Sequence, residues 1–153
     1  MARFVFKLEA VLRQRKQIEQ QKLRDLAVRQ QVVVGLQQNL LALQTQANDA
    51  AKDLRDNRLV GPINLSYLSA HRRYIMSMGR QAVAIAQKVA QAQKFVDEAR
   101  LALAEAAKNR KAIEKLKEKH YESWRQEQAK KEADALDEVG MNLAFEAFAG
   151  DDA

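Results

Sequence analysis

Residues 57–64 read Asn-Arg-Leu-Val-Gly-Pro-Ile-Asn, and this stretch decides how the rest of the chain folds. Pro62 is the only proline among 153 residues, and Gly61 stands directly before it. Proline lacks the N–H that an interior helical turn needs, and it disfavours helical geometry in the preceding residue. Glycine tolerates the backbone angles of a chain reversal. The long runs on either side hold no other strong breaker, so the sequence predicts two helices joined by a short turn.

The composition favours helix over sheet. The chain is rich in Ala, Gln, Lys, Arg, Glu and Leu, and only 6% of its residues are aromatic. This is typical of long helices and coiled coils, and strand-like clusters of β-branched and aromatic residues are missing. We therefore expect an all-α fold, a long antiparallel two-helix coiled-coil hairpin in one domain over 1–139. Helix 1 is expected over about 4–58, the turn over 59–65 and helix 2 over about 66–139.

The first helix carries a heptad repeat of apolar residues over about four heptads. Apolar residues that alternate three and four positions apart predict a coiled-coil seam. One position of the repeat holds Leu26, Val33, Leu40, Ala47 and Leu54, and the other holds Arg29, Leu36, Leu43 and Ala50.

The second helix carries a matching repeat over about five heptads. Asn64 or Ser66 can serve as its N-cap. One position holds Leu68, Ile75, Ala82, Val89, Val96 and Leu103, and the other holds His71, Met78, Ile85, Ala92, Ala99 and Ala106. Two such seams in one chain predict that the helices pack against each other.

Both helices lose this seam toward the same end of the hairpin, and both become basic there. Residues 1–29 hold eight Lys/Arg against three acids, and residues 108–131 hold nine against four. Like charges brought together favour a partner surface at this end, although solvated helix faces are the plainer alternative. Residues 132–153 hold seven acids and no base. Gly140 is expected to end helix 2, which leaves 140–153 as an acidic flexible tail.

The motifs of enzymes and metal proteins are missing from this sequence. No Gly-rich phosphate loop follows a strand, and His71 and His120 lack the spacing of metal ligands. A two-helix hairpin also offers little concave space for a substrate. We therefore expect a protein that is not an enzyme and holds no cofactor or metal. The absence of Cys and of any long apolar run favours a soluble intracellular protein.

Two stretches resemble the bacterial flagellar export protein family FliJ. Residues 4–16 read FVFKLEAVLRQRK, with Glu19 following, and are similar to the aromatic-basic opening of that family. Residues 113–120 read IEKLKEKH, with Glu132 and then Leu-Asp-Glu at 136–138, and are similar to its late basic stretch. Together with the length and the central turn, the resemblance covers nearly the whole chain.

The resemblance implies a function in flagellar biosynthesis and motility. Members of this family are antiparallel coiled coils that act as a stalk in the hexameric, FliI-like ATPase of type III protein export and promote its assembly and activity. They also contact the export gate protein FlhA and cycle export chaperones. The resemblance further implies a cytoplasmic protein that associates with the inner membrane at the flagellar base only through these partners.

The residues that the family uses carry over to two places in this sequence. The resemblance implies that the gate-binding residues are Tyr74 and Met78, in the first part of helix 2. The implied ATPase-binding residues, near the two chain ends, are Leu8, Leu12, Arg13, Arg15, Lys16, Lys117, Glu118 and Lys119.

Other functions stay open at this point. A stalk protein of the related injectisome is a close alternative to the flagellar stalk. A coiled coil that binds nucleic acid would use the two basic segments, since the pI is about 9.7. Against it, aromatic residues that could stack on bases are few, and the acids after residue 131 would repel phosphate, so no nucleic-acid partner is expected. A self-associating structural coiled coil is the third possibility.

Overall fold

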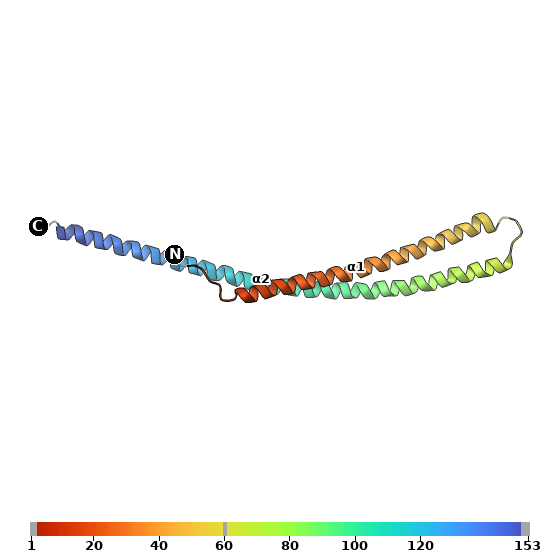
Figure 1. Ribbon diagram of the computed structural model, residues 1–153, viewed down its shortest axis with the longest axis horizontal. Helices are drawn as coiled ribbons and strands as arrows, with labels where there is room; N and C mark the ends of the chain where they lie inside the picture. Colours follow the sequence, from red (N-terminus) through yellow and green to blue (C-terminus); the bar gives the residue numbers. More distant parts are fainter. Residues whose placement is uncertain (1–2, 60, 151–153) are drawn as a thin grey trace. The chain divides into compact units, whose positions relative to one another are not determined.

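The structure is a computed structural model that describes residues 3–59 and 61–150, and for Arg58 and 144–150 the backbone alone. It contains α1 (Glu9–Asp53), a short π-helical turn η1 (Leu54–Arg58) and α2 (Leu65–Gly150) (Figure 1). The described residues form no strand. The expected all-α helical hairpin is therefore confirmed.

The chain forms two compact units, which we describe separately. The hairpin unit is Glu19–Ala106, and the terminal unit is Met1–Ile18 with Ala107–Ala153. The expected single domain over 1–139 stays a prediction.

The connection between the helices has the backbone that the Gly-Pro pair predicts. Gly61 has φ 94°, and it is the only described residue with a positive φ. An L side chain in this region is strained, so glycine is the residue that makes the reversal possible. The side-chain oxygen of Asn64 accepts a hydrogen bond from the backbone N–H of Tyr67 at 3.2 Å, which makes Asn64 the N-cap of α2.

The predicted seams form the interior of the hairpin unit. Every apolar residue of the two repeats is buried or half-buried. The centre is a cluster of Val33, Ala92 and Val96, with Leu26 and Leu36 packed against it. The exception is Arg29, which is exposed. Its guanidinium donates to the carbonyl oxygen of Phe95 at 3.4 Å and lies 5.6 Å from the centre of the Phe95 ring.

The predicted helix bounds need three corrections. α1 begins at Glu9 rather than near residue 4, because the aromatic and β-branched residues before it are weak helix formers and make contacts described below. α2 begins at Leu65, one residue earlier than expected. It also continues to Gly150 rather than ending at 139, so residues 140–150 are helical and not a flexible tail.

Gly140 does not act as a helix terminator. An added Cβ at Gly140 would meet nothing within 4 Å, so the residue sits in the open side of a continuous helix. A glycine in a helix interior costs only about 1 kcal/mol against alanine. The following residues, Met141 to Ala149, are mostly good helix formers, which offsets that cost. Asp151 and Asp152, the end of the expected acidic tail, lie outside the described residues.

Candidate functional site

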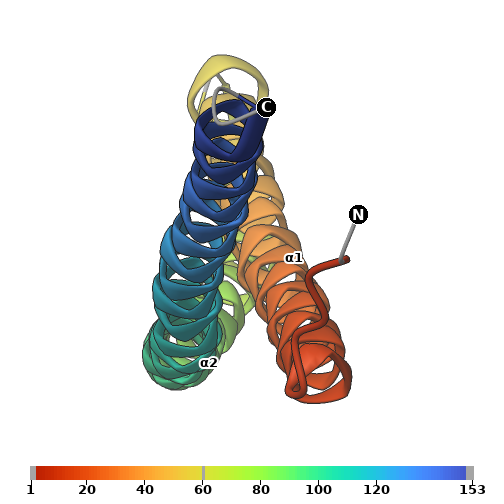
Figure 2. The same cartoon turned by 90° about the vertical axis from the view of Figure 1, so that its left-hand side faces the viewer.

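The N-terminal segment, residues 3–8, is not helical and leads into the start of α1 (Figure 2), and its aromatic rings contact α2 within the terminal unit. The ring of Phe4 meets Tyr121 edge-on, with centroids 5.3 Å apart, and lies 5.8 Å from Trp124. Tyr121 and Trp124 are themselves stacked at 5.9 Å. Aromatic pairs at these separations stabilise by about 1 kcal/mol beyond the area that they bury. The three rings therefore hold the start of the chain against α2.

Phe6 is the second anchor of this segment. Its side chain is 6% exposed, which is low for a protein with so little interior. It packs against the ring of His120 at 5.8 Å, and the ammonium of Lys117 lies 5.9 Å from its ring centre. A cation at this distance from an aromatic face is attracted by the electron density of the ring. The backbone N–H of Glu9 donates to the carbonyl of Phe6 at 3.1 Å, so the anchor leads directly into α1.

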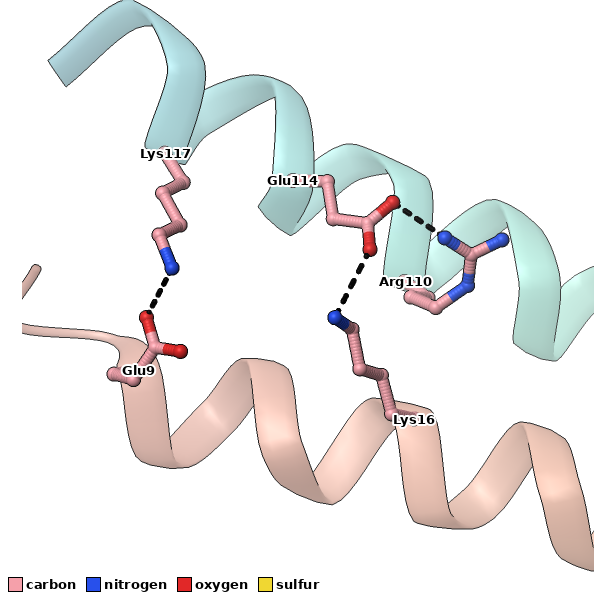
Figure 3. A network of polar contacts seen from close by, with 5 residues as sticks. All are labelled: Glu9, Lys16, Arg110, Glu114 and Lys117. Atoms are coloured by element: carbon pink, nitrogen blue, oxygen red, sulfur yellow. Dashed lines mark hydrogen bonds and ion pairs between the residues drawn. The ribbon is translucent and has the colours of Figure 1, made fainter. Parts of the chain in front are cut away.

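Two ion pairs join α1 to α2 just beyond this anchor (Figure 3). Lys117 Nζ lies 2.7 Å from a carboxylate oxygen of Glu9. Lys16 Nζ lies 3.5 Å from Glu114, which also pairs with Arg110 one turn away on α2. Glu9 and Lys16 are seven residues apart, and Glu114 and Lys117 three apart, so each pair shares one helix face. The antiparallel packing then brings opposite charges together.

This network perturbs the titration of the Glu9 carboxyl. The hydrogen bond from Lys117 lowers the pKa of the Glu9 carboxyl below its usual 4.5, and the charges of Lys117, Lys16 and Arg13 act in the same direction. A lowered pKa means that the folded state favours the charged form. The stabilisation is therefore present above about pH 4.5 and is lost as the pH falls through the folded-state pKa.

We expect this pH dependence to be small and to disappear in Glu9→Gln. The carboxylate is on the surface, where solvent and salt screen its interactions. Carboxyl chemical shifts measured by NMR against pH should place the midpoint of Glu9 below its usual pKa of 4.5. If the midpoint is not below this value, the ion pair with Lys117 does not persist in solution.

A shallow groove lies beside these contacts. Its volume is about 470 Å³, and it combines aromatic, aliphatic and charged side chains from the N-terminal segment, α1 and α2. Its lining residues are Phe4, Leu12, Lys16, Glu114, Lys117, Glu118 and Tyr121. Five of the seven take part in the ion pairs and ring contacts above, so the groove is a surface feature of this packed end.

The structure separates the expected ATPase-binding residues into three groups. Leu12 is 3% exposed and Leu8 is half-buried, so both serve the packing of the terminal unit. Lys16 and Lys117 take part in the ion pairs between the helices. The remaining four are exposed on the surface: Arg13, Arg15, Glu118 and Lys119.

The expected gate-binding pair is also divided, within the hairpin unit. Tyr74 is 51% exposed, whereas Met78 is 4% exposed and belongs to the seam. Tyr74 lines a second shallow groove of about 290 Å³, together with Tyr67 and His71, whose rings stack at 6.3 Å. Tyr74 is therefore the member of the pair that a partner can reach.

Sequence reasoning missed the aromatic anchors and the acidic partners of the terminal unit. Four of the nine aromatic residues cluster near the outer ends of the two predicted helices, namely Phe4, Phe6, Tyr121 and Trp124. That clustering was the signal that could have identified them. Glu9 and Glu114 gave no such signal, because single acids on basic helices are ordinary.

Residues 3–59 and 61–150 contain no group of three or more His, Asp or Glu side chains placed to hold a metal ion. None of the described helices combines the length and the apolar character that a membrane crossing requires.

Comparison with known protein families gives a match over most of the chain. A family model described as Flagellar FliJ protein matches residues 4–147, which is nearly the whole chain. Neither curated proteins nor solved structures yield a match to this sequence.

Proposed function

The chain belongs to the FliJ family of flagellar proteins, and from this membership we propose that it is the stalk that couples the export ATPase to the export gate. The FliJ family belongs generally to flagellar type III protein export, and it is not a known family of enzymes. The match to a flagellar family also favours the flagellum over the injectisome.

The ATPase-binding surface in this proposal is the terminal unit. The observation that carries it is the division of the cations there. Lys16 and Lys117 pair with acids of the other helix, whereas Arg13 and Arg15 are exposed and have no ion pair among the described residues. Long cationic side chains that form no ion pair within the fold are available to a partner. We assign the FliI-like hexamer to this surface, with Glu118 and Lys119 beside it.

The gate protein FlhA is assigned to the neighbourhood of Tyr74 in the hairpin unit. The exposed ring of Tyr74 and the shallow groove beside it support this assignment. Met78 is buried, so in this proposal it only holds the helix in place. The same proposal includes the cycling of export chaperones and peripheral association with the inner membrane, because both would depend on binding to these export partners.

The test is ATP hydrolysis by the flagellar export ATPase of the same organism, with and without this protein, together with the hexamer fraction by size. We expect the protein to increase both. The double variant Arg13→Glu, Arg15→Glu should remove most of that increase without loss of helicity. The control is Arg72→Glu, Arg73→Glu, which reverses two exposed arginines of the hairpin unit and should leave the increase intact.

Two results would contradict the proposal. If the unaltered protein changes neither hydrolysis nor hexamer fraction, the stalk function is not supported. If it changes them but both double variants behave alike, the arginines of the terminal unit are not the contact.

A further inference from the structure

One face of α2 in the terminal unit points away from α1. Lys117, Tyr121 and Trp124 contact α1 or the N-terminal segment, so they mark the side of α2 that is covered. On the other side, positions three or four residues apart form a continuous stripe from Lys108 to Leu143. Every residue of this stripe is exposed. We call the stripe the outer face of α2.

The first half of the outer face is basic. It holds two acids, Glu118 and Glu122, and its five bases are Lys108, Lys111, Lys115, Lys119 and Arg125. None of these bases forms an ion pair among the described residues. The other members of this half are Ala112 and Gln126. The charges of these bases are therefore not used by ion pairs within the terminal unit.

The second half of the outer face is apolar, with Glu132 as its one charge. Leu136 is 72%, Val139 is 55% and Leu143 is 61% exposed. The small members of this half are Ala129, Ala133 and Gly140. All side chains from 129 to 143 are exposed, so the described chain offers this stretch of α2 no neighbour. Apolar side chains aligned on an exposed helix face indicate a docking surface.

The two halves match when a second copy lies antiparallel along the same face. With residues 125 and 126 at the two-fold axis, Lys119 of one copy faces Glu132 of the other, and symmetry makes this pair occur twice. Lys115 faces Leu136, so its aliphatic stem covers an apolar side chain while its ammonium stays in water.

The other positions of the outer face also fit in this register. Lys108 faces Leu143, as Lys115 faces Leu136, and Arg125 faces Gln126. Larger side chains meet small ones, with Glu118 opposite Ala133, Glu122 opposite Ala129, Val139 opposite Ala112 and Lys111 opposite Gly140. No facing pair joins two like charges. At the edge of the face, Lys130 and Asp137 add one charge of each sign.

We propose that two copies of this chain associate antiparallel through the outer face of α2. Charge complementarity selects a second copy as the occupant. Residues 108–131 hold nine bases and four acids, whereas residues 132–153 hold seven acids and no base. From 108 to 150 they form one continuous helix, so the acidic end cannot fold back onto its own basic stretch. A second copy in the reverse direction brings each basic stretch beside an acidic one.

The size of the outer face predicts a weak, reversible dimer. Residues 108–143 span about 54 Å of helix, and one helix presents a contact strip about 10 Å wide. The footprint is therefore roughly 500 Å² per copy, or about 1,000 Å² in total, at the lower limit of specific interfaces. Because ion pairs contribute to it, the dimer should weaken as salt is added.

Sedimentation velocity over a range of protein concentrations measures this association. The unaltered chain should shift from monomer to dimer as its concentration rises. Lys119→Glu places two acids opposite each other at both symmetric positions, and Glu132→Lys does the same with two bases. Each variant alone should raise the dissociation constant about fivefold or more.

Mixing the two variants tests the pairing directly. In the mixed dimer the new acid at 119 faces the new base at 132, and the original Lys119 faces the original Glu132. The equimolar mixture should therefore associate about as tightly as the unaltered chain. The matched controls are Lys131→Glu and Glu138→Lys, which make the same changes at exposed residues on the opposite side of α2 and should leave the association unchanged.

Cross-linking tests the direction of the pair. The chain has no Cys, so a single introduced cysteine is the only thiol. With a short bis-maleimide reagent, Gln126→Cys, beside the two-fold axis, should give a covalent dimer, and Glu127→Cys, on the opposite side of the helix, should not. Two thiols from Ala112→Cys lie about 40 Å apart in the antiparallel pair but side by side in a parallel one.

Three results would overturn the proposal. They are a chain that stays monomeric at all concentrations, a mixture of the two charge variants that associates no better than either alone, and efficient cross-linking through position 112. These measurements use this protein alone, and Arg13 and Arg15, which carry the proposed ATPase contact, lie on α1. The dimer and the stalk function are therefore tested independently.

Discussion

Val96→Asp should unfold the hairpin unit or weaken it severely. Val96 is 2% exposed, the lowest value among the described residues, and it packs with Val33 and Ala92 at the centre of the seam. A carboxylate there would lose most of its hydration and would lie against the aliphatic cluster of Val33, Ala92, Leu26 and Leu36. The cost of an unpaired buried charge is several kcal/mol, and we expect a loss of about 3 kcal/mol or more in the free energy of unfolding.

Urea denaturation followed by circular dichroism at 222 nm measures this loss. The matched control is Val139→Asp, which makes the same change on the same helix at a residue that is 55% exposed, and which should change stability little. A Val96→Asp protein as stable as the control would mean that the seam around Val33 and Val96 does not form.

Phe6→Ala should release the N-terminal segment while leaving both helices intact. Phe6 anchors residues 3–8 through its burial against His120 and Lys117. Removing a buried phenyl ring costs about 3 kcal/mol, which is more than the surface contacts of a six-residue segment can replace. Because the segment lies outside α1, we expect local undocking and no global unfolding.

Trp124 is the only tryptophan and touches Phe4, so its fluorescence reports the docked state. In Phe6→Ala its emission should shift to longer wavelength, and trypsin should cleave after Lys7 much faster than in the unaltered protein. The control is Val5→Ala, one residue away but with 75% of the side chain exposed, which should change neither readout. Unchanged emission and cleavage in Phe6→Ala would show that the segment does not depend on this ring.

The same variant bears on the proposed function. Arg13 and Arg15 follow the docked segment within two turns of α1, so undocking should alter the surface that is offered to the ATPase. A Phe6→Ala protein that still stimulates hydrolysis fully would separate the role of the arginines from that of the aromatic anchor.

The sequence by itself determined the hairpin and its interior. The heptad repeats depend on local periodicity, and a seam spaced three and four residues apart must face a partner wherever the helix lies. Gly61 and Pro62 act through their own backbone restrictions, and Asn64 caps the helix that starts beside it. For the same reason the burial of Met78 followed from its seam position, and this removed it from the accessible gate-binding residues.

Only the tertiary structure decided which residues of the terminal unit form packing contacts and ion pairs within the fold. Whether Lys117 contacts Glu9, or Phe4 contacts Tyr121, depends on the register between segments more than a hundred residues apart. Local periodicity does not set that register where the seam is broken by charged residues. The packing also decided that Lys16 and Lys117 form ion pairs with the other helix while Arg13 and Arg15 do not, because an ion pair depends on which side chains the neighbouring helix brings within reach and not on residue type.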